Sequence, residues 1–121
     1  MEKKSSILFI MNPISGTDNK SSVPKHIEET LDKNVFDYSI KETEYSGHAY
    51  EIAKEAAKKG FDFVIAVGGD GTVNEVGRAL THTNTAMGII PCGSGNGLAR
   101  HLMIPLDIKK SIEIINKRTI H

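Results

Sequence analysis

The sequence has very little cysteine and no long hydrophobic run. Cys92 is the one cysteine among 121 residues, so no disulfide bond can form within the chain, which fits a reducing, cytoplasmic compartment. The longest early apolar run, Ile7 to Met11, is only five residues long and follows a polar start. Such a run is too short for a signal peptide or a membrane span. We therefore expect any contact with lipid to be peripheral to the membrane.

The sequence also has no excess of positive or negative charge. Fifteen basic residues balance fifteen acidic ones, which gives a formal net charge of zero. No global field therefore favours nucleic acid as a partner. The sequence contains no internal repeat and no low-complexity tract, and its 39% hydrophobic content is ordinary for a soluble globular protein. We expect residues 1–121 to form one domain.

Hydrophobic periodicity predicts strands that alternate with helices along the whole chain. The predicted strands cover residues 7–11, 36–41, 61–67 and 87–90. The predicted helices cover residues 23–31, 47–59 with Ser46 as the N-cap, 72–80, 96–103 and 107–116. Strict alternation favours an α/β fold with an open, mainly parallel sheet and flanking helices, similar to a Rossmann fold.

A glycine-rich loop follows the third predicted strand. Gly68-Gly69-Asp70-Gly71-Thr72 separates an apolar strand from a predicted helix. Glycines leave bare backbone amides that a phosphate group can approach closely, and the N-terminus of the next helix favours negative charge. The lone carboxylate, Asp70, is suited to holding a magnesium ion or steering a proton, although it could equally cap the helix. The loop predicts a nucleotide phosphate site.

Two more loops share this composition. Asn12-Pro13-Ile14-Ser15-Gly16 follows the first strand, and Cys92-Gly93-Ser94-Gly95-Asn96-Gly97 follows the fourth. The carboxyl ends of parallel strands meet at one edge of the sheet, where ligands bind in open α/β folds. The three loops together therefore predict a binding pocket.

Better-known nucleotide motifs are absent. The sequence has no Gly-x-x-x-x-Gly-Lys-Ser/Thr loop, and Gly93-Ser94-Gly95 begins a Gly-x-Gly-x-x-Gly motif that Asn96-Gly97-Leu98 does not complete. This spacing disfavours a dinucleotide-binding module. The histidines have no metal-like spacing with Cys92, so we predict no residues that form a metal site of their own.

Four motifs in order carry a resemblance to a known family. They are Asn12-Pro13 with Ser15-Gly16; Thr43 with Gly47-His48-Ala49; Gly68 to Thr72 with Val73-Asn74-Glu75-Val76; and Pro91 with Gly93-Ser94-Gly95-Asn96 and Leu98-Ala99-Arg100. Over nearly its whole length the chain resembles the N-terminal catalytic domain of the diacylglycerol kinase and sphingosine kinase family of lipid kinases. The Gly-Gly-Asp-Gly element also occurs in NAD kinases and phosphofructokinases, whose fold is similar. The Asn-Pro loop and Asn74-Glu75 favour the lipid-kinase branch.

The resemblance implies that ATP, with Mg²⁺, lies across the three loops. Asp70 is the implied catalytic residue, engaging magnesium or the reacting phosphates. The implied ATP-binding residues are Asn12, Pro13, Ser15, Gly16, Thr43, Gly68, Gly69, Asp70, Gly71, Thr72, Asn74, Glu75, Gly93, Ser94, Gly95 and Asn96.

The same resemblance implies a lipid kinase that transfers the γ-phosphoryl group of ATP to a lipid hydroxyl. Diacylglycerol is the first expected acceptor, and a sphingoid base is the second. Family members carry a second, β-rich domain, which the sequence of residues 1–121 lacks. We therefore expect the chain to be a fragment that is inactive alone, whose parent protein reaches its lipid at a membrane surface through the missing domain. An NAD kinase-like enzyme and a non-catalytic nucleotide-binding regulatory module remain as alternatives, and a homodimer remains open.

Two side chains near the motifs have open roles. Glu75 is either an exposed helix carboxylate or a partner for Asn12 or Arg100. His48 lies in the first turn of a predicted helix, where we expect a structural, hydrogen-bonded histidine and not a catalytic one.

Overall fold

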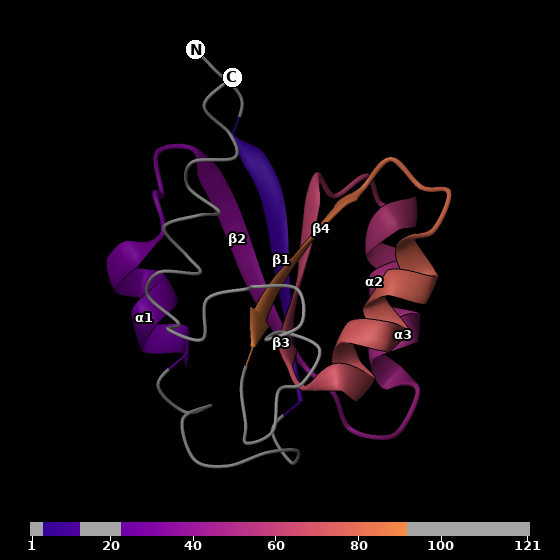
Figure 1. Cartoon of the computed structure of the whole chain (residues 1–121). Coiled ribbons are helices and arrows are strands. Elements are labelled where there is room, and N and C mark those ends of the chain that lie inside the picture. The colour runs from indigo at the N-terminus through magenta and orange to yellow at the C-terminus, as the bar shows by residue number, and fades with distance from the viewer. Residues whose placement is uncertain (1–3, 13–22, 92–121) are drawn as a thin grey trace.

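The computed structural model describes residues 4–12 and 23–91 and has strands and helices in alternation (Figure 1). The strands are β1 (Ser5–Met11), β2 (Phe36–Glu42), β3 (Phe63–Gly68) and β4 (Ala86–Pro91). The helices are α1 (Val23–Thr30), α2 (His48–Lys58) and α3 (Asp70–Leu80). The open parallel α/β fold expected from the sequence is therefore confirmed for this part of the chain.

The four strands form one parallel sheet in the order β2-β1-β3-β4. Met11, at the end of β1, lies opposite Glu42 on one side and Val67 on the other. The chain first moves outward from β1 to β2, then crosses back over β1 to place β3 on its other side. The order therefore reverses between β1 and β3, and the loops that follow these two strands diverge and leave room for a ligand at this edge.

Helices cover both faces of the sheet (Figure 1). On the α1 face, Ile27 packs with sheet side chains such as Phe9, Phe36 and Ile65, all nearly inaccessible to solvent. On the other face, α2 and α3 pack side by side over the sheet. Alternation of side chains along each buried strand supplies both cores, which explains why residues 7–11 of β1 and 63–67 of β3 are all apolar.

Alanines set the packing distance between α2 and the sheet. Ala49, Ala53 and Ala56 recur along one helix face and are buried against Leu8 and Ile10 of β1, among others. Small side chains let the helix approach the sheet closely. The N-terminus of α2 is therefore held near the carboxyl ends of the strands.

The predicted helices and strands are confirmed within the described residues, with changes at their ends. α3 begins at Asp70 and not at Thr72. β3 begins at Phe63. The side chain of Asp62, just before it, accepts a hydrogen bond of 2.8 Å from the Ser6 amide of β1. The predicted helices over 96–103 and 107–116 lie outside the described residues.

The predicted N-cap of α2 was wrong. Gly47, and not Ser46, is the N-cap residue, with φ of 90° and no side chain to bond the helix amides. The turn needs a left-handed residue at this point, which glycine adopts without steric cost.

None of the helices between residues 23 and 91 is both long and apolar enough to cross a lipid bilayer.

Two glycines give opposite predictions for stability. Gly60 ends α2 with φ of +84°, and its amide donates to the carbonyl oxygen of Ala57 at 3.2 Å. Gly77 lies within α3, where an added Cβ would make only an ordinary contact with the sulfur of Met87 at 3.7 Å. Gly60→Ala should lower the free energy of unfolding by about 1 kcal/mol because of the left-handed backbone. Gly77→Ala should raise it by roughly 0.5–1 kcal/mol.

Urea denaturation of the two variants beside the parent chain measures both changes. Changes of the same sign in the free energy of unfolding of the two variants would contradict these backbone assignments.

Candidate functional site

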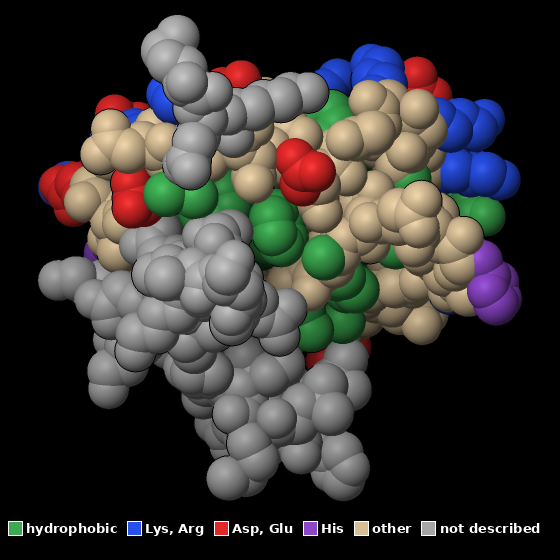
Figure 2. Space-filling model, turned by 90° about the horizontal axis from the view of Figure 1, so that it is seen from above, with side chains coloured by type: hydrophobic (Ala, Val, Ile, Leu, Met, Phe, Trp, Pro, Cys, Tyr) green, Lys and Arg blue, Asp and Glu red, His purple; other side chains and the backbone are tan. Residues whose placement is uncertain are grey.

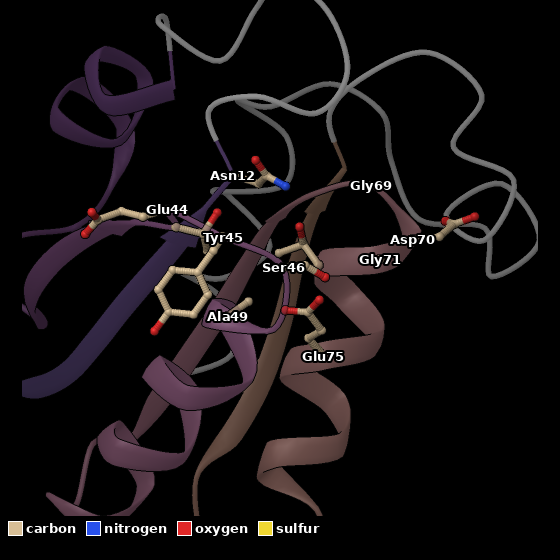
Figure 3. Close-up of a pocket in the computed structure, with 11 residues that line it drawn as sticks. Asn12, Glu44, Tyr45, Ser46, Ala49, Gly69, Asp70, Gly71 and Glu75 are labelled. Carbon is tan, nitrogen blue, oxygen red and sulfur yellow. The ribbon is translucent and has the colours of Figure 1, made fainter.

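A pocket of about 420 Å³ opens at the carboxyl ends of the strands, where the strand order reverses (Figure 3). Three segments form its walls: the end of β1, the connection from β2 to α2, and the loop from β3 into α3. Its lining residues are Asn12, Thr43, Glu44, Tyr45, Ser46, Ala49, Gly69, Asp70, Gly71, Thr72 and Glu75.

Backbone hydrogen bonds hold the strand ends together at the base of the pocket. The Thr43 amide donates to the carbonyl oxygen of Met11 at 2.8 Å, and the Asn12 amide donates to that of Val67 at 3.4 Å. Thr43 is only 7% exposed, so it forms part of the floor. The structure thus brings together Asn12, Thr43 and the glycine loop, three parts of the predicted site that are distant in sequence.

The glycine loop is shaped by its contact with Thr72. Gly68 has φ of +156°, and a Cβ added there would lie 3.0 Å from Oγ1 of Thr72 and 3.2 Å from its Cβ. Since the Thr72 side chain is buried, it has little room to retreat. Both the backbone angle and the contact therefore require glycine at position 68.

The loop leads directly into the N-terminus of α3. Gly69 is the extended N-cap residue, and its carbonyl oxygen accepts the Val73 amide at 3.1 Å as the helix begins. The first turn of a helix presents amides without intrahelical acceptors, and its dipole favours an anion. A Cβ added at Gly71 would meet nothing within 4 Å. The geometry suits a phosphate group approaching the backbone.

Asp70 lies at the rim of the pocket. It is the first residue of α3, exposed to solvent, and its carboxylate points away from Ser46 and Glu75 (Figure 3). The positive end of the α3 dipole favours a carboxylate in the first helical turn. This attraction offsets the repulsion between Asp70 and Glu75. Asn74, also predicted to bind ATP, is exposed on α3 and is not among the residues that line the pocket.

Glu75 has a partner that the sequence did not suggest. Its Oε2 accepts a hydrogen bond of 3.2 Å from the amide of Gly47, at the N-terminus of α2. Neither alternative raised from the sequence, an exposed carboxylate or a partner for Asn12 or Arg100, names this contact. Arg100 lies outside the described residues.

The connection from β2 to α2 and the first turn of α2 supply four lining residues that the sequence analysis did not assign to the site: Glu44, Tyr45, Ser46 and Ala49. The position of this connection at a strand end was the available signal, because all carboxyl ends of a parallel sheet share one edge.

An aromatic pair stiffens this connection. The rings of Tyr45 and His48 stack with centroids 4.3 Å apart, and the Tyr45 hydroxyl donates to Oε1 of Glu51 at 2.7 Å. That hydrogen bond to a carboxylate raises the pKa of Tyr45 above its usual value. Nδ1 of His48 accepts the Glu44 amide at 2.9 Å, so the structural role predicted for His48 is confirmed.

The charged side chains that line the pocket within the described residues are all negative. Glu44, Asp70 and Glu75 line it, whereas none of its lining residues within the described part of the chain is lysine or arginine. Lysine and arginine side chains instead gather at one margin of the opposite edge, where the strands begin (Figure 2). No cluster of three potential metal ligands occurs within residues 4–12 and 23–91. Among the described lining residues, a polyphosphate would therefore meet backbone amides and neutral polar side chains such as Asn12 and Thr43, and a cation would offset the carboxylates.

Seven predicted ATP-binding residues fall outside the described part of the chain. They are Pro13, Ser15, Gly16, Gly93, Ser94, Gly95 and Asn96.

Known proteins resemble this chain in both sequence and fold. The profile of the diacylglycerol kinase catalytic domain matches residues 6–121. A diacylglycerol kinase of Bacillus subtilis (strain 168) is 40% identical over 113 residues, covering 88% of this chain and 36% of that protein. One from Staphylococcus saprophyticus is 36% identical over 117 residues, covering 95% of this chain and 38% of that protein.

A solved structure extends the likeness to three dimensions. The crystal structure of a diacylglycerol kinase from Bacillus anthracis (strain Sterne) superposes with a TM-score of 0.81 at 31% identity. The superposition covers 98% of this chain and 42% of that one. The chain thus spans well under half the length of each of these relatives, and over that length sequence and fold agree: it belongs to the diacylglycerol kinase catalytic domain family.

Proposed function

We propose that this chain forms the ATP-binding part of a lipid kinase that transfers the γ-phosphoryl group of ATP to a hydroxyl of diacylglycerol. The observation that carries the proposal is the place of the glycine loop. It runs from β3 into the N-terminus of α3 at the reversal of strand order, facing Asn12 and Thr43 across one pocket. Ligands of open α/β sheets bind at this position.

The backbone would hold the phosphates. Gly69 and Gly71 carry no side chain that could block the approach of a phosphate to the amides at the start of α3. At position 68, just before them, glycine avoids the collision with Thr72 that a side chain would make. Phosphoryl transfer depends mainly on positioning and on stabilising charge, which such a cradle supplies.

Magnesium fits the acidic character of the pocket. Mg²⁺ is usually held by one or two carboxylates together with substrate phosphates, and does not require a cage of protein ligands. Asp70, at the rim beside the loop, is the residue we assign to hold the ion that ATP brings. When bound, Mg²⁺ offsets the negative charge of the phosphates. Asp70 thereby positions the reacting group, and we do not assign it the removal of the proton.

The names of the relatives support the proposed acceptor. The curated relatives compared above are named diacylglycerol kinases, so we place diacylglycerol ahead of a sphingoid base. The rest of the parent protein would supply the lipid site, in peripheral contact with a cytoplasmic membrane surface.

Nucleotide binding by this chain should depend on magnesium. We expect isothermal titration calorimetry to give a dissociation constant for MgATP below about 1 mM. Excess EDTA should weaken the binding at least about tenfold, because Glu44, Asp70 and Glu75 repel uncomplexed phosphates. No heat of binding at millimolar MgATP would contradict an ATP site in this chain, and equal affinity with EDTA would contradict the assigned role of the ion.

Asp70→Asn separates catalysis from binding. In the full-length protein that contains this chain, we expect the variant to lose roughly 10²-fold or more in turnover of diacylglycerol in mixed vesicles. Binding of ATP should persist, since the amides of the loop remain. Asp37→Asn, which makes the same substitution at an exposed residue of β2 outside the pocket lining, is the matched control and should leave turnover within about twofold.

The same assay identifies the acceptor. Radiolabelled phosphate from ATP should appear in diacylglycerol, less in sphingosine, and not in soluble NAD. Preferred labelling of NAD would overturn the lipid-kinase proposal. Unchanged turnover in Asp70→Asn would overturn the role of Asp70, whereas unchanged cellular function of a variant that has lost turnover would favour a regulatory module.

A further inference from the structure

We infer that Glu75 is a positioning residue that holds the two walls of the pocket at a fixed separation, and is not itself a ligand of the nucleotide. The inference rests on the proposed function of the pocket. It begins at the N-terminus of α2, where the N-cap residue is Gly47 and no side chain of its own caps the helix. A helix start of this kind leaves amides in need of an acceptor.

Glu75 supplies that acceptor from another helix. Its Oε2 accepts the Gly47 amide at 3.2 Å, across 28 positions in sequence. The contact is partly buried, so water competes for it less than at the surface. The Glu75 side chain is long enough to reach this amide, and its oxygen accepts the hydrogen bond that the start of the helix needs.

The contact joins two opposite walls. Glu75 lies one turn after the glycine loop on α3, and Gly47 directly follows Glu44, Tyr45 and Ser46 of the other wall. In Figure 3 the Glu75 carboxylate points from α3 toward Ser46, between these two walls. The buried alanine face of α2 holds the body of that helix, and Ala49 is its buried residue nearest the N-terminus. Glu75 adds a contact with α3 at Gly47, beyond that alanine face.

This assignment also accounts for a negative charge in a phosphate pocket. A carboxylate free to face the triphosphate would weaken binding by repulsion. Directed at the Gly47 amide, its charge is partly satisfied before the nucleotide arrives.

Two variants of nearly opposite chemistry test the assignment. Glu75→Gln keeps the length and an acceptor oxygen but removes the charge, whereas Glu75→Asp keeps the charge but is one methylene too short for the 3.2 Å contact. In the full-length protein we expect Glu75→Gln to hold KM for ATP within about twofold of the parent. Glu75→Asp should raise that KM about tenfold, with kcat changed by less than about twofold.

Hydrogen exchange supplies a readout that needs no nucleotide. Without ATP, amide exchange over residues 44–48 should quicken about tenfold in Glu75→Asp and stay near the parent rate in Glu75→Gln. Glu55→Ala is the matched control, because Glu55 is an exposed α2 carboxylate paired at 4.0 Å with Lys59, away from the pocket. It should change neither exchange nor KM.

The outcomes are distinct. A larger rise in KM for ATP in Glu75→Gln than in Glu75→Asp would show that the Glu75 charge acts on the ion or the nucleotide, especially if extra magnesium restores activity. That result would overturn the assignment. So would unchanged exchange and KM in Glu75→Asp. If the parent protein fails to bind ATP, the proposed function fails, whereas the exchange result still decides whether Glu75 holds the wall.

Discussion

The parallel pairing of β3 with β1 is the constraint on which the rest of the structure depends. Because β2 already occupies one side of β1, the chain must cross back over the sheet to put β3 on the other side. That crossing sends α2 to the face opposite α1 and opens the edge between β1 and β3. Asn12, Thr43 and the glycine loop are distant in sequence, yet they meet because each directly follows a strand.

Within this frame, local backbone chemistry shapes the site more than side chains do. Gly68 packs against the buried Thr72, Gly69 begins α3, and Gly47 begins α2. The side chains that face the pocket include three carboxylates and no lysine or arginine among those described. These side chains support the proposal that a cation binds here together with an anion. The contact of Glu75 with Gly47 keeps one of the carboxylates directed at the protein.

Much of this arrangement could be predicted from the sequence. Uninterrupted apolar strands such as Ile7 to Met11 and the alanine face of α2 gave the fold, since burial on both faces of a sheet leaves a clear hydrophobic signature. The glycine loop gave one wall of the pocket. The N-cap of α2 was missed because Ser46 has the better capping side chain, whereas the turn required the left-handed angle of Gly47. The partner of Glu75 was missed because a contact between two helices depends on how closely they pack, which single-sequence periodicity does not report.

We propose that phosphates bind to the backbone at the start of α3, in the pocket beside β1. A two-dimensional amide NMR titration of the ¹⁵N-labelled chain with Mg²⁺ and a non-hydrolysable ATP analogue tests this binding site. The largest shifts should fall on Gly69, Asp70, Gly71 and Thr43, which line this pocket. Shifts confined to the lysine-rich opposite edge of the sheet, with these amides unmoved, would contradict the proposal.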